Sequence, residues 1–113
     1  MIDANDRQNR ILPTMRLTAE QAEIIRHTAR KHFGADARIW LFGSRTDDAA
    51  RGGDIDLLIE SRTKMPNPFM ASVHLEVDLQ NALDDQKIDI VISEPGKEET
   101  PIHRIARNTG IEL

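Results

Sequence analysis

Three short apolar runs constrain the fold of this 113-residue chain more than any other feature of its sequence. Each run has only four or five residues and is rich in residues that favour extended backbone, so it predicts a strand rather than a helix. The unbroken apolar character of the first run predicts a strand buried on both faces, as in a sheet that carries helices on either side. The runs cover residues 39–42, 55–59 and 88–92.

Helical patterns separate and flank these runs. Thr18 and Gln21 have the spacing of a capping box, which predicts the start of a helix. Apolar residues then recur at helical intervals up to Phe33, and Gly34 marks the end. The order of elements predicts an α/β (α+β) fold, with a small mixed sheet of three or more strands flanked by helices. Further helices are predicted at residues 44–51, 69–84 and 102–110.

The predicted helix over residues 69–84 carries apolar residues on two opposite sides. Leu75, Leu79 and Leu83 form one stripe, whereas Val73 and Val77 lie on nearly the opposite side. A surface helix normally needs only one apolar face. Two interpretations stay open. Either the helix is wedged between the sheet and the C-terminal tail, or the second stripe meets another subunit, which would make the protein a homo-oligomer.

Size and composition fit one soluble domain. We expect residues 16–113 to form a single domain and the polar residues 1–15 to form a poorly ordered tail. The net charge of −4 argues against general binding to nucleic acids. The chain has no cysteine, no run of signal-peptide type at its start and no stretch long enough to span a membrane, so we expect a cytoplasmic protein.

Three aspartates are placed where carboxylates are costly unless they are paired or bound to a cation. Asp54 and Asp56 lie two apart at the start of a predicted strand, so alternation puts both on one face of the sheet. Asp89 lies inside the third predicted strand. If the strands pair, a divalent cation is the natural neutraliser, and oxygen ligands favour Mg²⁺ or Mn²⁺. The alternative is a turn-capping Asp54 and a salt-bridged Asp89.

A second pattern follows the first predicted strand. Gly43 allows the backbone to approach a ligand closely, and Ser44 precedes a predicted helix whose N-terminus would offer free N–H groups to phosphate. Arg45 adds a fork-shaped cation. Taken alone, the same residues also fit an ordinary glycine turn with a capping serine.

The other polar clusters predict no further site. The four histidines have no metal-binding spacing and are expected at the surface or in packing contacts. His103, Arg104 and Arg107 could contact a partner or a nucleotide, but a solvated basic helix face is the simpler interpretation.

Taken together, the two patterns resemble the nucleotidyltransferase superfamily that includes DNA polymerase β and the kanamycin nucleotidyltransferases. Phe42-Gly43-Ser44-Arg45 is followed, nine residues after Ser44, by Asp54-Ile55-Asp56-Leu57, and Asp89 lies in a later strand. Within the superfamily the chain is similar to the minimal nucleotidyltransferase (MNT) group, over about residues 17–91. Two departures are Asp47 and Asp48, where members often carry a glycine, and Gly53, where many carry a serine.

The resemblance implies a chemical role for each of these residues. Asp54 and Asp56 would hold the metal on a nucleoside triphosphate, and Asp89 would help to hold a second metal near the attacking hydroxyl. Gly43 and Ser44 would bind the β- and γ-phosphates, with Arg45 as a helper. The implied reaction is Mg²⁺-dependent transfer of a nucleoside monophosphate, AMP from ATP, to a hydroxyl.

The resemblance also implies a partner. Minimal nucleotidyltransferases pair with small helical HEPN proteins, in which the nucleotidyltransferase is the antitoxin and modifies its toxin. An alternative is a non-catalytic nucleotide- or partner-binding module that neutralises a helical partner by occlusion. A nucleic-acid polymerase or end-transferase is disfavoured by the acidic net charge. The acceptor, the preferred base, the oligomeric state and the activity of the isolated chain stay open.

Overall fold

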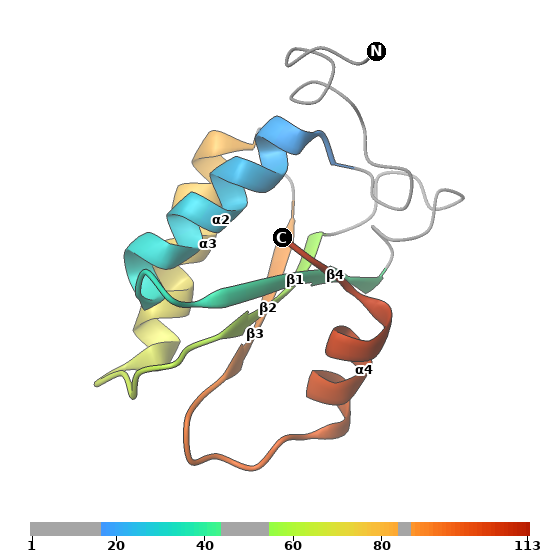
Figure 1. The fold of residues 1–113 in the computed structure, drawn as a ribbon. Helices are drawn as coiled ribbons and strands as arrows, with labels where there is room; N and C mark the ends of the chain where they lie inside the picture. Colours follow the sequence, from blue (N-terminus) through green and yellow to red (C-terminus); the bar gives the residue numbers. More distant parts are fainter. Residues whose placement is uncertain (1–16, 44–54, 84–86) are drawn as a thin grey trace.

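A four-stranded mixed sheet with the strand order β3-β2-β1-β4 organises the protein (Figure 1). The structure is a computed structural model that describes residues 17–43, 55–83 and 87–113. Three helices accompany the sheet in this part of the chain, so the predicted mixed sheet flanked by helices is confirmed. The elements are α2 (Ala19–Phe33), β1 (Arg38–Phe42), β2 (Ile55–Glu60), α3 (Pro68–Ala82), β3 (Ile88–Ser93), α4 (Pro101–Thr109) and β4 (Ile111–Glu112).

Strand pairing combines both directions. β1 pairs antiparallel with β2 and with β4, whereas β2 and β3 run parallel. The three predicted strands differ from β1, β2 and β3 by a single residue at one end. β4 was not predicted, because a two-residue strand is too short to show a period. It is held by pairing with β1 and by the N–H of Leu113, which donates to the carbonyl of Ile39 at 2.8 Å.

The side chains on the two faces of the sheet pack into two different cores. Alternate residues such as Ile39, Leu57 and Ile88 pack against α2 and α3 on one face. On the other face, α4 covers a smaller core (Figure 1). β1 is therefore buried on both faces, as predicted, and most of β2 is buried as well. β3 is an edge strand, and only its first residue is fully buried. The smaller core consists of Trp40, Phe42, Leu58 and Ala106.

Helix α2 begins and ends as the sequence predicts. Thr18 accepts a hydrogen bond from the N–H of Gln21, and the Gln21 side chain accepts one from the N–H of Thr18. At the other end, Gly34 has a φ of 107° and its N–H donates to the carbonyl of Arg30. The predicted apolar stripe is buried, and Phe33 is its last member. This capped helix covers one half of the sheet face.

Helix α3 buries one apolar stripe and leaves the other exposed. Leu75 and Leu79 are fully buried, whereas Val77 on the opposite side is 49% exposed. The C-terminal helix lies on the other face of the sheet (Figure 1). The predicted wedging of this helix between the sheet and the C-terminal tail is therefore wrong. The reason is the chain topology: after β3 the chain crosses to the other face of the sheet, so α4 packs there and does not cover α3.

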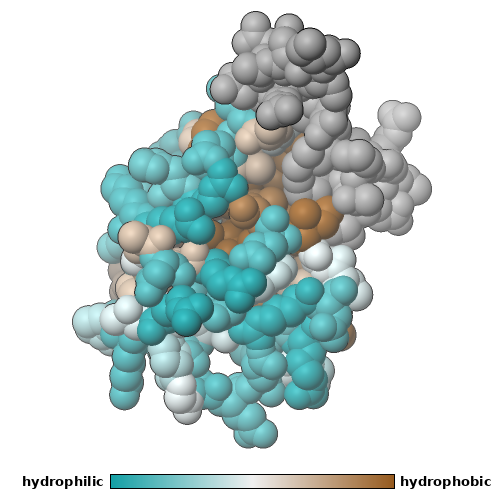
Figure 2. Space-filling view, viewed as in Figure 1, coloured by the Kyte–Doolittle hydropathy of each residue, from teal (hydrophilic) through white to brown (hydrophobic). Residues whose placement is uncertain are grey.

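The visible face of the molecule is mostly hydrophilic, and hydrophobic residues gather around its middle (Figure 2). Ile111 and Leu113 at the end of the chain are partly buried against the main core. None of the helices in the described segments is long and apolar enough to cross a membrane. The predicted tail over residues 1–15 and the predicted helix over residues 44–51 lie outside the described residues.

The short strand β4 yields a test of its side-chain anchor. The guanidinium of Arg38 donates two hydrogen bonds of 2.8 Å to the carboxylate of Glu112. This hydrogen bonding holds the pKa of Glu112 below its usual range, although partial desolvation opposes the shift. A lowered pKa in the folded state stabilises the fold at neutral pH. That stabilisation is lost as the pH falls below the usual glutamate range and through the lowered pKa.

We therefore expect Glu112→Gln to lower the free energy of unfolding at pH 7 by about 0.5 kcal/mol, as is usual for exposed ion pairs. The difference from wild type should vanish near pH 3. Urea denaturation at the two pH values measures it, with Glu98→Gln in the loop before α4 as the control. An equal difference at both pH values would contradict the ion-pair account.

Candidate functional site

Strand register brings two of the predicted site residues together. Asp56 on β2 is paired with Asp89 on β3, and Phe42 on β1 is paired with Asp56. Residues that are paired on neighbouring strands point to the same face of the sheet, and the two strands lie about 4.8 Å apart. The two carboxylates thus form a row with Phe42, and we call these three residues the aspartate row. It lies on the sheet face that carries α4.

Gly43 directly follows β1, and its backbone lies close to the side chain of Asp56. Its φ is +76°, a conformation that side chains rarely adopt. A Cβ atom placed on Gly43 would lie 2.2 Å from the Oδ2 atom of Asp56. The carboxylate therefore occupies the space that any side chain at position 43 would need. Gly43 thus lies close to Asp56, while its predicted approach to a bound phosphate stays a prediction.

The two aspartates differ in exposure. Asp89 is exposed on the edge strand, and Asp56 is half-buried between β1 and β3. Lys87 immediately precedes β3, and its carbonyl accepts a hydrogen bond from the N–H of Ile55 at 2.9 Å. This bond and the strand pairing fix the start of β3 against the start of β2. The aspartate row is therefore rigidly placed but open to solvent at Asp89.

The remaining predicted site residues are not placed by the structure. Asp54, Ser44 and Arg45 lie outside the described residues, so the sequence prediction for them stands as made. Within the described residues, no group of three or more metal-binding side chains of the His, Cys, Asp and Glu types is assembled. The two carboxylates that are placed supply oxygen donors only, which is the donor chemistry that Mg²⁺ and Mn²⁺ prefer. They thus fit the predicted metal, with Asp54 as the predicted third ligand.

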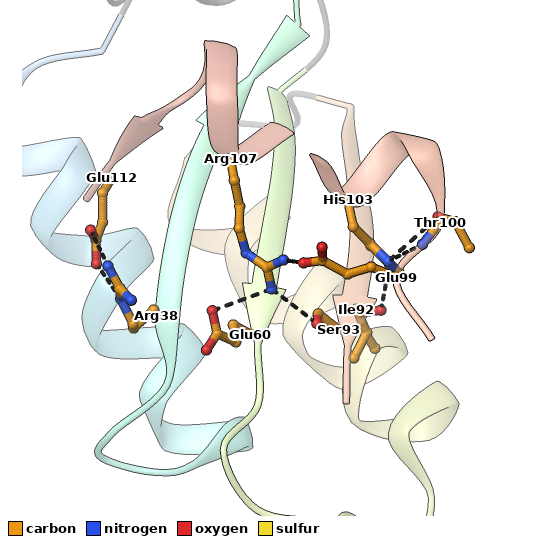
Figure 3. A network of polar contacts seen from close by, with 9 residues as sticks. All are labelled: Arg38, Glu60, Ile92, Ser93, Glu99, Thr100, His103, Arg107 and Glu112. Atoms are coloured by element: carbon orange, nitrogen blue, oxygen red, sulfur yellow. Dashed lines mark hydrogen bonds and ion pairs between the residues drawn. The ribbon is translucent and has the colours of Figure 1, made fainter. Parts of the chain in front are cut away.

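Sequence reasoning missed the role of Arg107. Its guanidinium donates to Glu60 at 3.3 Å and to Ser93 at 3.1 Å and forms an ion pair with Glu99 (Figure 3). It also lies 5.5 Å from the centre of the Trp40 ring. The predicted solvated basic face is therefore wrong for this residue. Arg107 holds α4 on the sheet, and no local pattern could have shown that its partners come from four other segments.

His103 has a similar structural role. The N–H of Thr100 donates to its Nδ1 at 3.0 Å, and its Nε2 lies 3.1 Å from the carbonyl of Ile92 (Figure 3). Because Nδ1 accepts a hydrogen bond, the ring proton fits on Nε2, and Nε2 then donates to the carbonyl of Ile92. His103 thus caps α4 and ties it to β3. The prediction that the histidines serve packing is confirmed here.

A cavity of about 250 Å³ lies at the other end of β2 and β3 from the aspartate row. Two arginines and two glutamates line it, and Arg107 already pairs with Glu60 there. The paired charges leave little net attraction for a triphosphate. The carboxylate chemistry, rather than this cavity, therefore marks the candidate site. The cavity is lined by Glu60, Ser61, Arg62, Ser93, Glu94, Pro95 and Arg107.

Comparison with protein families identifies the class to which this fold and site belong. Residues 22–111 match the model of the nucleotidyltransferase domain family. This match covers most of the chain, including β1, β2 and β3 with the aspartate row. The chain therefore belongs to the nucleotidyltransferase domain family. No curated protein matches it significantly.

Two solved structures have a similar fold. One is the crystal structure of a mutant MntA–HpeT toxin–antitoxin, with 20% sequence identity and a TM-score of 0.56 over 81% of this chain and 70% of that chain. The other is a rebuilt structure of the tri-AMPylated Shewanella oneidensis HEPN toxin in complex with its MNT antitoxin. It has 22% identity and a TM-score of 0.53 over 81% of this chain and 66% of that chain. At these identities the likeness establishes the fold.

The contact of Gly43 with Asp56 yields a stability test with a matched control. Gly43→Ala places a Cβ against the carboxylate and puts alanine at positive φ, so it should destabilise the fold by about 1–3 kcal/mol. Gly96→Ala shares the positive φ, at +79°, but meets nothing within 4 Å. Denaturation midpoints of the two variants separate the backbone cost from the contact. Equal losses would contradict the close approach of Gly43 to Asp56.

Proposed function

We propose that this chain is a Mg²⁺-dependent nucleotidyltransferase that transfers AMP from ATP to a hydroxyl group on a protein partner. The observation that carries the proposal is the in-register pairing of Asp56 with Asp89, with the backbone of Gly43 closed against Asp56. Family membership supports the reaction class. The acidic net charge of −4 favours a protein acceptor over a nucleic acid.

Each site residue has a role in this reaction. Asp54, Asp56 and Asp89 would hold the divalent cations, which when bound neutralise the charge of the triphosphate. Gly43 and Ser44 would bind the β- and γ-phosphates at the end of β1, with Arg45 beside them. Asp89 is exposed on the edge strand, so it is the carboxylate that an incoming hydroxyl can reach.

The transfer is an in-line displacement at the α-phosphorus. The acceptor hydroxyl oxygen forms a bond to the α-phosphorus while the bond from that phosphorus to the bridging oxygen breaks. Pyrophosphate leaves with the electron pair. The hydroxyl proton passes to Asp89, which has the exposure needed for a general base. The products are an AMP-modified acceptor and pyrophosphate.

The structural neighbours support a particular kind of acceptor. One of them is an MNT antitoxin in complex with a HEPN toxin that carries three AMP groups. We infer that this chain is likewise the antitoxin of a pair with a small helical HEPN-type protein, acting in the cytoplasm where ATP is available.

A transfer assay tests the proposal. The purified chain, Mg²⁺, α-labelled ATP and a HEPN-type protein co-expressed with it as the proposed partner should give a labelled partner. Asp56→Asn should lower the rate by about two orders of magnitude or more, because several kcal/mol of charge stabilisation would be lost. Asp36→Asn, in the turn between α2 and β1, is the control.

Labelling that persists in Asp56→Asn would overturn the catalytic role. A partner that binds both variants equally, without any labelling by wild type, would instead favour the non-catalytic module that acts by occlusion. The assay therefore separates the two functions that the sequence leaves open.

A further inference from the structure

Helix α4 crosses the strands of the sheet obliquely. Near its start, His103 contacts the carbonyl of Ile92 on β3 at 3.1 Å. Just after its end, Gly110 is packed so closely on β1 that an added Cβ would lie 2.7 Å from the Leu41 carbonyl oxygen and 3.2 Å from the Cβ of Phe42. The helix therefore starts over the edge strand β3 and ends over β1. Its two flanks face opposite ends of the strands.

One flank of α4 faces away from the aspartate row. Arg107 reaches Glu60 and Ser93, which form the paired row at the far end of β2 and β3 (Figure 3). In a helix, residues two apart lie about 200° apart around the axis. Ile105 therefore lies on the opposite flank from Arg107. That flank faces the start of β2 and β3, where Asp56 and Asp89 lie.

The flank toward the aspartates is apolar and exposed. Ile102 is 41% exposed and Ile105 is 53% exposed, and we call these two residues the apolar flank. Val91 is half-buried and packs against the small core under α4, two residues along β3 from Asp89. Single exposed apolar residues are ordinary on protein surfaces. A pair that borders a carboxylate row is a surface prepared for contact with an apolar group.

The arrangement of the site indicates which reactant meets this flank. Gly43, which approaches Asp56, lies on the β1 side of the aspartate row, so the proposed triphosphate enters there. Asp89 lies on the opposite side, on β3, which is the last strand on that side of the sheet among the described residues. The start of α4 lies over the same strand. The second reactant can therefore approach Asp89 past the apolar flank.

We propose that the apolar flank of α4, Ile102 and Ile105, binds a protein acceptor that carries an apolar side chain beside its reacting hydroxyl. The contact sets that hydroxyl at Asp89. An apolar surface on an acidic chain suits a protein segment, since a polyanionic acceptor would need cations along its path. The inference rests on the proposed function and names the surface that recognises its substrate.

A second exposed apolar surface supplies the control. Phe69, Met70 and Val77 are exposed on α3, which packs on the face of the sheet away from the aspartate row. Val77 is 49% exposed, close to the 53% of Ile105, and both lie on helices. Val77→Glu therefore introduces the same charge at a matched site that the proposal does not use.

The experiment measures partner binding and nucleotide binding separately. Calorimetry with the HEPN-type partner protein of the transfer assay compares wild type, Ile105→Glu, Ile105→Ser and Val77→Glu, and a second titration uses ATP with Mg²⁺. We expect both Ile105 variants to weaken partner binding at least tenfold and to raise the KM for the acceptor. ATP binding should be unchanged, and Val77→Glu should behave as wild type.

Several results would overturn the inference. Unchanged partner affinity in both Ile105 variants, or a loss in Val77→Glu instead, would place the docking surface elsewhere. Loss of ATP binding together with partner binding would show a structural role for Ile105. Wild type that labels RNA but not protein would exclude a protein acceptor. If wild type labels no acceptor at all, the proposed function fails, whereas labelling that the Ile105 variants leave intact refutes only the docking surface.

Discussion

The parallel pairing of β2 with β3 is the constraint on which the candidate site depends. This register sets Asp56 beside Asp89, and a shift by one residue would turn Asp89 toward the core under α2 and α3. The apolar pairs Ile55–Ile88 and Leu57–Ile90 resist such a shift, because their side chains belong to that core. The same burial that stabilises the sheet therefore fixes the spacing of the carboxylates.

One face of the sheet carries the larger apolar core, and the other face carries the candidate site. α2 and α3 cover one face with a large core, whereas α4 covers the other face only over its middle and far end. Arg107 holds α4 in that position through Glu60 and Ser93. Of the aspartate row, Phe42 is buried under the end of α4, Asp56 is half-buried and Asp89 is exposed. Most of the apolar core therefore lies on the opposite face of the sheet, while Asp89 keeps contact with solvent.

The sequence predicts the elements well because their signals are local. The capping box at Thr18 and the apolar run that forms β1 each lie within a few residues, and both are confirmed. The pairing of Asp56 with Asp89 could only be assumed from the sequence, because strand register depends on contacts between distant segments. The role of Arg107 and the edge position of β3 were not predicted, for the same reason. Asp54, Ser44 and Arg45 stay predictions.

The most direct test of the central claim is a Mn²⁺ titration followed by NMR, since the paramagnetic ion broadens the amide signals of residues near it. The account predicts that Gly43, Asp56 and Asp89 lose intensity first, and that Asp56→Asn abolishes this loss. Asp36, which precedes β1, and Gly96, which follows β3, lie beyond the end of the strands opposite Asp56 and Asp89, so their signals should be unaffected at the same Mn²⁺ concentration. Broadening spread evenly over the acidic residues, or unchanged by Asp56→Asn, would contradict a metal site formed by the register of β2 and β3.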